Sequence, residues 1–400
     1  MLVPKLRFKR DDGTEYPEWS LLEFGSFCQA IDIRTSDTEK YPLYSLTIEE
    51  GVTPKTDRYI RDYLIKKEGD SYKIVPNSAF VYNPMNLRFG ALKANHSGLT
   101  VCVSGYYDVF AMGQPNTLYF WENYLTTPKM LNYYDRISTG SLIEKKRVYY
   151  SEFLKIKKSL PCIEEQQKIA DFLSAVDEVI ARSEAEVQSL EQQKKASMQK
   201  IFSQEVRFKR EDGTEYPDWE KKKIGELTSQ LITRNKENTS YPVYSVNNIK
   251  GFIPQLDQFK DREVASSDKT NYKIVEYHHF AYNPSRINVG SIAYLNERKT
   301  VIVSPLYVVF ECTGIIPEYL NLYVRTKDFH NQRKANTVGS VRDSLTYEGF
   351  SEITMFVPCL EEQQKISDFL STYDEAISYA KQELEKWKEL KKGLLQKMFI

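Results

Sequence analysis

The sequence PCIEEQQKIADFL, at residues 161–173, returns as PCLEEQQKISDFL at residues 358–370, with 11 of 13 positions identical. The first copy opens a stretch, residues 164–202, that has no Gly or Pro and consists mainly of Glu, Gln, Lys, Ala and Leu. A proline just before a helix and acidic residues in its first turn both favour a helix start. The repeated sequence therefore predicts two long helices, beginning after Pro161 and Pro358.

Apolar residues in both predicted helices follow a four-three spacing. This heptad pattern predicts a coiled coil, with two separate core helices as the alternative. At about 1.5 Å per residue the first helix is a rod of roughly 58 Å. We expect the two helices to pair antiparallel, with pseudo-two-fold symmetry. The heptad positions are Ile169, Leu173, Val176, Ile180, Val187, Leu190 and Ile201, matched by Ile366, Leu370, Tyr373, Ile377, Ala380, Leu384, Trp387, Leu394 and Met398.

The repeat extends to the segments before the helices. Residues 7–19 read RFKRDDGTEYPEW and residues 207–219 read RFKREDGTEYPDW, again identical at 11 of 13 positions. A period of about 200 residues is the size of a whole domain, so the chain consists of two copies of a domain followed by a helix. We assign residues 1–160 and 204–357 to the two domains, and residues 161–203 and 358–400 to the helices.

Each domain has the composition of a mixed α+β fold. Short runs rich in Tyr, Phe, Val and Ile end at Gly, Pro or Asn, as in AFVYNP and TVIVSPLYVVF, which predicts strands. The stretches LYFWENYLTTPKMLNYYD and EYLNLYVRTKDFHNQRKAN predict helices. We expect a β-rich sheet packed with a few helices in each copy.

The composition of 400 residues, with 41% hydrophobic and 28% charged residues, is that of a globular protein with no apolar run long enough to span a membrane. The N-terminal residues lack the apolar stretch of a signal peptide, and the five cysteines include no CxxC pair. We therefore expect a cytoplasmic protein; a bridge between the repeat equivalents Cys162 and Cys359 is the alternative. The net charge is zero, so any attraction to nucleic acid must be local.

Motifs for catalysis or cofactor binding are missing from the sequence. The four histidines are scattered without metal-ligand spacing, and neither GxGxxG nor GxxxxGK[ST] occurs. The YNP sequences at 82–84 and 282–284 suggest the NPPY motif of amino-methyltransferases, but Met85 and Ser285 follow instead of proline. We interpret YNP as a turn after a strand, and we predict that the chain binds no metal and no cofactor.

Two basic segments recur at the same point of each copy. Residues 129–158 contain eight basic and three acidic residues, and residues 325–342 contain five basic and one acidic residue. Both pass through a Gly-Ser turn, where small residues allow close approach to a phosphate. Solvated surface charge is the alternative. The predicted DNA contacts are Ser141, Lys145, Lys146 and Arg147 in the first copy and Arg333, Lys334, Ser340 and Arg342 in the second.

The loop after each YNP is the second predicted contact region. Arg pairs with guanine and Asn with adenine, so these side chains are suited to read base edges, with an ordinary hairpin as the alternative. The predicted residues are Tyr82, Asn83, Asn86 and Arg88, and Tyr282, Asn283, Arg286 and Asn288. The loops differ between the copies, so two different readers would recognise a split, non-palindromic DNA site.

The doubled order of domain, proline, EEQQKI and helix resembles the specificity subunit of type I restriction–modification enzymes, along essentially the whole chain. The resemblance implies that each domain is a target-recognition domain for one half of a bipartite double-stranded DNA site. It also implies that the coiled coil sets the half-site spacing and docks two methyltransferase subunits, which a motor-nuclease subunit then joins. S-adenosylmethionine, ATP and Mg²⁺ are expected on those partners. By position, the docking residues are Glu164, Glu165, Gln166 and Gln167, and Glu361, Glu362, Gln363 and Gln364.

Two other functions remain open at this point. An orphan protein-interaction scaffold or regulator would share the fold but lack modification partners. An enzyme with an unrecognised site would need residues whose substitution abolishes turnover while leaving DNA and partner binding intact.

Overall fold

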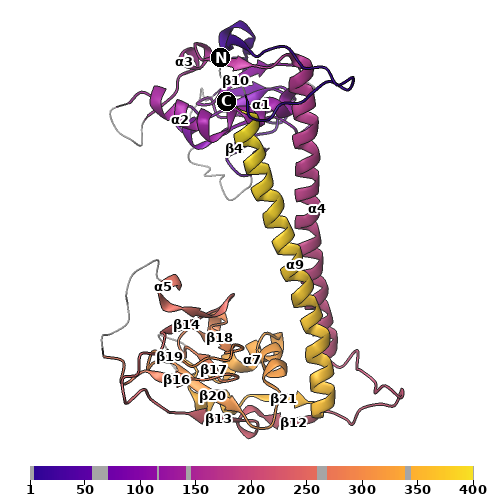
Figure 1. The fold of residues 1–400 in the computed structure, drawn as a ribbon, viewed down its shortest axis with the longest axis vertical. Helices are drawn as coiled ribbons and strands as arrows, with labels where there is room; N and C mark the ends of the chain where they lie inside the picture. Colours follow the sequence, from indigo (N-terminus) through magenta and orange to yellow (C-terminus); the bar gives the residue numbers. More distant parts are fainter. Residues whose placement is uncertain are drawn as a thin grey trace. The chain divides into compact units, whose positions relative to one another are not determined.

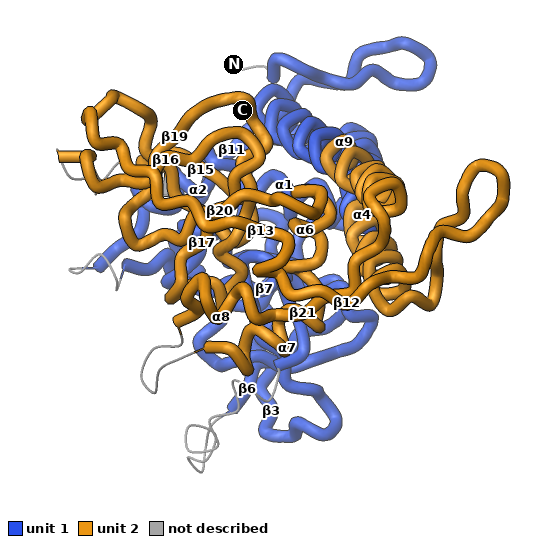
Figure 2. Tube along the Cα trace, turned by 90° about the horizontal axis from the view of Figure 1, so that it is seen from below, with its two compact units in different colours: residues 1–185, 381–400 blue, residues 186–380 orange. Residues whose placement is uncertain are grey.

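The computed structural model describes residues 4–55, 71–114, 117–140, 146–258, 268–337 and 344–399. The chain divides into two compact units, Met1–Ala185 with Lys381–Ile400, and Glu186–Ala380 (Figure 2). Each unit contains a globular part and a portion of each of two long helices, α4 (Ile163–Phe202) and α9 (Leu360–Met398) (Figure 1). Both long helices lie where the sequence predicts them.

The globular part of the first unit is built from short strands and helices. Its strands are β1 (Ser20–Glu23), β2 (Cys28–Ala30), β3 (Arg34–Thr35), β4 (Tyr44–Thr47), β5 (Gly51–Pro54), β6 (Tyr72–Val75), β7 (Phe80–Tyr82), β8 (Leu92–Ala94), β9 (Val101–Val103), β10 (Asp108–Met112) and β11 (Lys157–Leu160). Its helices are α1 (Leu118–Leu125), α2 (Pro128–Ile137) and α3 (Tyr150–Leu154), with 3₁₀ turns η1 (Phe24–Ser26) and η4 (Leu87–Phe89).

The second unit repeats this order. Its strands are β12 (Glu220–Lys223), β13 (Thr228–Leu231), β14 (Tyr244–Asn247), β15 (Gly251–Pro254), β16 (Lys273–Val275), β17 (Phe280–Tyr282), β18 (Ile292–Tyr294), β19 (Val301–Val303), β20 (Val308–Cys312) and β21 (Thr354–Val357). Its helices are α5 (Gln255–Gln258), α6 (Pro317–Tyr323), α7 (Lys327–Ala335) and α8 (Tyr347–Ser351), with 3₁₀ turns η7 (Ile224–Glu226) and η8 (Ile287–Val289).

The largest sheet of each unit is antiparallel and four-stranded, in the order β2-β10-β7-β8 or β13-β20-β17-β18. The strand that precedes each long helix pairs with the first strand of its own copy: β11 with β1, and β21 with β12. The start of the long helix is thereby fixed to the globular part. The mixed α+β fold predicted from the sequence is confirmed.

The central strand β7 separates two hydrophobic cores. Successive side chains of a strand point to opposite faces, so Phe80 and Tyr82 enter an aromatic core with Phe110 and Phe153, whereas Val81 enters a second, valine-rich core. Strand β17 repeats this arrangement in the second unit. The side chains of β7 and β17 are therefore packed on both faces of the sheet. Many exposed residues that differ between the two copies lie in the loops.

The long helices pair antiparallel within each unit. In the first unit, Lys391 Nζ lies 2.7 Å from a carboxylate oxygen of Asp177, and Lys388 Nζ lies 2.8 Å from one of Glu184. In the second unit, Lys194 Nζ lies 2.5 Å from Asp374. Lower numbers on α4 thus meet higher numbers on α9, as the heptad pattern predicted. None of the described helices has the length and apolar character needed to cross a lipid bilayer.

Candidate nucleic-acid interface

The YNP sequence forms the same turn in both units. The side-chain oxygen of Asn83 accepts a hydrogen bond from the backbone N–H two residues on at 3.0 Å, and Asn283 does so at 3.1 Å. The chain then forms η4 or η8 and leaves it at Gly90 or Gly290, with φ of 96° and 86°. Positive φ favours glycine. Both copies therefore present the residues of this loop on one scaffold.

Tyr82 and Tyr282, predicted as DNA contacts, are fully buried. The Tyr82 hydroxyl donates to the Val148 carbonyl oxygen at 3.3 Å, and its ring packs against Phe153. Strand alternation turns both rings into the aromatic cores. We withdraw both tyrosines as DNA contacts, because neither ring reaches the surface.

Arg88, predicted to read a base, already has a partner in the first unit. One of its guanidinium nitrogens lies 2.9 Å from Asp135 on α2, and the guanidinium lies 4.4 Å from the centre of the Phe89 ring. The Arg88 side chain is only 9% exposed, and its hydrogen bond holds the pKa of Asp135 below its usual value. The neighbouring Asn86 is exposed. In this unit, Asn86 is the better placed of the two for contact with a ligand.

The second unit has no equivalent of the Arg88–Asp135 ion pair, because both residues differ there. Asn288 and Lys334 stand at the positions of Arg88 and Asp135, and both are exposed. Arg286, two residues before Asn288, is exposed and lines a pocket of about 430 Å³. The loop of the second unit therefore carries an accessible arginine.

The pocket beside Arg286 combines polar and apolar groups, and hydrogen bonds join several of its lining residues. The Ser291 hydroxyl donates to the Val246 carbonyl oxygen at 2.7 Å, and the Val246 N–H donates to the Tyr307 hydroxyl at 3.3 Å. A guanidinium and several amides in one pocket match the hydrogen-bonding edges of purines. The lining residues are Ser245, Val246, Asn247, Asn248, Gln255, Asn283, Arg286, Val289, Ser291, Ser304, Leu306 and Tyr307.

The matching surface of the first unit is less polar, mainly because Ile48 stands where the second unit has Asn248. Ile48, Phe89 and Tyr106 occupy the positions of Asn248, Val289 and Leu306, and their exposed fractions are 44%, 54% and 86%. Apolar and aromatic groups of this kind contact the thymine methyl group. One scaffold thus presents two different chemical surfaces.

Sequence reasoning missed the pocket residues that come from β14 and the loops around it. Asn247, Asn248 and Gln255 lie 31 to 39 positions before Arg286 in the chain, so no local motif joins them. The available signal is the alignment of the two copies. There, Ile48 changes to Asn248 just after a shared stretch that reads YPLYSL in one copy and YPVYSV in the other.

The predicted basic contacts are only partly accessible. Arg147 and Lys334 are exposed, Lys146 is half-buried, and Arg333 is buried. The Arg333 Nε has no hydrogen-bond partner among the described residues. The remaining predicted contacts, Ser141, Lys145, Ser340 and Arg342, lie outside the described residues.

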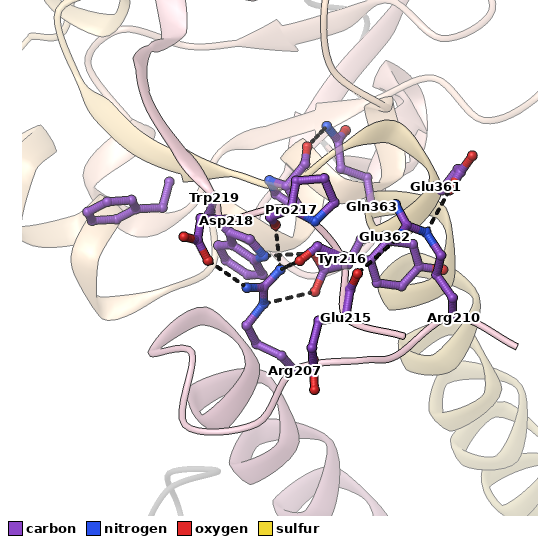
Figure 3. Close-up of polar contacts among 12 residues, drawn as sticks. Arg207, Arg210, Glu215, Tyr216, Pro217, Asp218, Trp219, Glu361, Glu362 and Gln363 are labelled. Atoms are coloured by element: carbon purple, nitrogen blue, oxygen red, sulfur yellow. Dashed lines mark hydrogen bonds and ion pairs between the residues drawn. The ribbon is translucent and has the colours of Figure 1, made fainter. Parts of the chain in front are cut away.

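In each unit the RFKR segment and the tryptophan that follows it contact the EEQQ residues at the start of the long helix; Figure 3 shows these contacts in the second unit. In the second unit, the Arg207 guanidinium lies 2.9 Å from one oxygen of Glu362, and the Trp219 indole N–H donates to the same oxygen at 2.9 Å. Arg207 also donates to the Pro217 carbonyl oxygen at 2.7 Å. The hydrogen bond to Glu362 raises the pKa of Arg207 above its ordinary value.

The first unit repeats these contacts between Arg7, Trp19 and Glu165. The Arg7–Glu165 distance is 2.7 Å and the Trp19–Glu165 distance is 3.1 Å. Both glutamates are fully buried. The pair of contacts explains why RFKR, the tryptophan and EEQQ recur together: the first segment of each copy is attached to the start of its helix.

This burial corrects half of the predicted docking residues. Glu165, Gln166, Glu362 and Gln363 are buried, and Gln166 and Gln363 donate to the carbonyl oxygens of the residues that precede their helices, at 3.0 and 2.8 Å. They hold the fold together and offer no surface to a partner. Glu164, Glu361 and Gln364 are exposed and Gln167 is half-buried, so only these four remain as predicted docking residues.

Among the described residues, no group of three or more His, Cys, Asp or Glu side chains is arranged to hold a metal ion. The described cysteines are all free thiols.

Two domains of one scaffold, each attached to antiparallel helices, define a duplicated recognition fold. A sequence profile described as "Type I restriction modification DNA specificity domain" matches residues 216–389. With this match and the likenesses below, the chain is similar to the specificity subunits of type I restriction–modification enzymes.

Relatives support the assignment over long stretches. The MjaVIII type I restriction enzyme specificity subunit of Methanocaldococcus jannaschii is 23% identical over 270 residues, and the putative MjaX specificity subunit is 24% identical over 212 residues. The alignments cover 61% and 50% of this chain, and the chain spans 61% and 49% of those relatives.

Solved structures share the fold over nearly the full length. The type I restriction–modification S subunit of M. genitalium superposes with a TM-score of 0.55 at 15% identity, covering 100% of this chain and 99% of its own. A chain from a structure of type I R-M complex assembly also gives 0.55, at 13% identity, covering 96% of this chain and 98% of its own.

Proposed function

We propose that this chain recognises a bipartite, non-palindromic site in double-stranded DNA and performs no chemistry itself. Residues 1–160 and 204–357 act as target-recognition domains, each for one half-site. Residues 161–203 and 358–400 set the spacing between the half-sites and dock two methyltransferase subunits. S-adenosylmethionine, ATP and Mg²⁺ belong to the methyltransferase and motor-nuclease partners, and the complex works in the cytoplasm.

One observation carries this proposal: equivalent loops on the same scaffold expose different side chains. The second unit presents Arg286 and Asn248 around η8, at the positions where the first unit presents Asn86 and Ile48 around η4. A structural role would need no such change, because the buried positions beneath the loops are kept. Two domains that recognise different DNA sequences need different exposed side chains, since base edges are distinguished by hydrogen bonds and methyl contacts.

The experiment is a methylome. The full chain is co-expressed with the methyltransferase subunit encoded beside it, and N6-methyladenine is mapped by single-molecule sequencing. We expect one split motif with two unlike halves, absent when this chain is omitted. Methylation that does not depend on this chain would favour the orphan scaffold or regulator instead.

A length change in the helices tests their spacing role. Seven residues inserted into both α4 and α9, at facing positions, preserve the heptad register and add about 10 Å of helix. We expect the gap between the half-sites to lengthen by about three base pairs, with both half-site sequences unchanged. The same methylome measures this, and an altered half-site sequence would show that the helices do more than set a distance.

A further inference from the structure

The two copies carry an exposed charged hairpin, residues 8–16 and 208–216, whose sequence and geometry are the same in both units. The sequences FKRDDGTEY and FKREDGTEY differ at one position. In each hairpin the backbone N–H of the arginine donates to the threonine carbonyl oxygen at 2.9 Å. The backbone N–H of that threonine donates to the aspartate carboxylate at 2.9 Å. The hairpins are thus two preformed copies of one surface.

Most of each hairpin faces solvent. Residues 11–15 and 211–215 are exposed, and the ion pair Lys9–Glu15 has side chains that are 62% and 64% exposed. The equivalent pair, Lys209–Glu215, is exposed to nearly the same degree. The hairpin base is fixed by aromatic packing: Phe8 packs on Phe172 of α4 in one unit, and Phe208 on Phe369 of α9 in the other. A few polar contacts also join the hairpins to these helices: Lys168 lies 2.5 Å from Asp11, Lys365 donates to the Lys209 carbonyl oxygen at 2.8 Å, and Arg210 lies 3.9 Å from Glu361.

Folding alone does not account for this identity. The turn requires the glycine, at φ of 84° and 85°, and the aspartate cap. The exposed Lys–Glu pair adds little, because solvated ion pairs contribute weakly to stability. Elsewhere the exposed positions of the two copies have diverged, as in Ile48 against Asn248. A solvated surface held constant in both copies therefore serves a common contact.

Charge identifies the class of that contact. Each hairpin presents two basic residues and three carboxylates: Lys9, Arg10, Asp11, Asp12 and Glu15 in the first, and Lys209, Arg210, Glu211, Asp212 and Glu215 in the second. Net negative charge disfavours the phosphate backbone. Alternating charges instead suit a protein surface with the complementary pattern, where charge complementarity sets specificity.

We infer that the two hairpins are equivalent docking surfaces for two copies of one protein subunit. Each hairpin pairs its lysine and arginine with carboxylates of that subunit, and its own carboxylates with basic side chains. The identity of this subunit as the methyltransferase rests on the function proposed above. The hairpins thereby supply the outward docking surface that the buried Glu165 and Glu362 do not.

The test exchanges the positions of two opposite charges in the hairpin and leaves its net charge and its ion pair in place. Lys9→Glu with Glu15→Lys keeps an ion pair across the hairpin but reverses the sign at both positions, and Lys209→Glu with Glu215→Lys does the same in the second copy. The matched control exchanges the exposed pair Glu220 and Lys222, which lies 2.8 Å apart on β12, outside the hairpin. Each full-length variant is co-purified with the neighbouring methyltransferase subunit, and the mass of the complex gives its stoichiometry.

We expect two methyltransferase subunits on the unaltered chain and on the control, one when either hairpin is exchanged, and none when both are. Like charges placed opposite each other should weaken each contact on the order of 100-fold. Unchanged thermal unfolding confirms that each variant is folded.

Retention of two subunits by the chain with both hairpins exchanged would overturn the inference, as would an equal loss in the control. Loss of DNA binding with both subunits retained would assign the hairpins to DNA instead. An unaltered chain that binds no methyltransferase subunit overturns the proposed function itself, which distinguishes that failure from failure of the docking surface.

Discussion

Replacement of Glu362 by alanine is expected to destabilise the second unit by about 3 kcal/mol or more. Removing one member of a buried ion pair costs roughly 3–5 kcal/mol, since the remaining group keeps its desolvation cost without its partner. Here the loss leaves both the Arg207 guanidinium and the buried Trp219 indole N–H without the carboxylate at 2.9 Å. Arg207 retains some solvent contact, which places the effect near the lower end of the range.

The neighbouring Glu361→Ala is the matched control, because it removes a carboxylate from the same helical turn. Glu361 is 74% exposed and lies 3.9 Å from Arg210, so its loss should change stability little. Urea unfolding of the full chain, followed by circular dichroism, measures both. Equal effects of the two substitutions would show that the buried cluster does not attach the first segment to the helix. Glu165→Ala should reproduce the large effect in the first unit.

The helices and the duplicated mixed domains were predictable because their signals are periodic or repeated. Heptad spacing reflects which residues face a partner helix, so it can be recognised in the sequence without knowledge of the tertiary fold. The repeated RFKR and EEQQ segments showed that the chain contains two copies of a domain followed by a helix. They did not show that Glu165 and Glu362 turn inward, because a glutamate at a helix start has the same sequence signature when it is exposed and when it is buried.

The site was predictable at the level of the loop but not of the residue. The YNP turn and its glycine gave the position of the candidate reading loop in both copies. Whether an arginine there is accessible depends on residues far along the chain: Arg88 pairs with Asp135, 47 positions away, and in the second unit Asn288 and Lys334 replace both members of the pair. Side-chain pairing across such distances has no periodic signal, so only the folded structure reveals it.

This difference between the units yields an asymmetric prediction for DNA recognition. Arg286→Ala should relax specificity in the half-site read by the second domain, by about 1–3 kcal/mol per lost bidentate contact, or roughly 10–100-fold in discrimination. Arg286 is exposed beside the pocket, where Asn248 and Gln255 supply further hydrogen-bonding groups. The other half-site should stay unchanged, since Arg286 belongs to the second unit alone.

Arg88→Ala is the matched control for Arg286→Ala, at the same loop of the other copy. Its guanidinium is held by Asp135 and is only 9% exposed, so its loss should change half-site preference less than the loss of Arg286. Methylation rates of the assembled complex on duplexes with single changes in each half-site measure both variants. A uniform loss of rate on all sequences would place Arg286 on the phosphate backbone rather than a base. A larger relaxation from Arg88→Ala would show that DNA binding breaks the pair with Asp135. Because the rest of the loop scaffold is shared, either outcome assigns the difference to the exposed side chains alone.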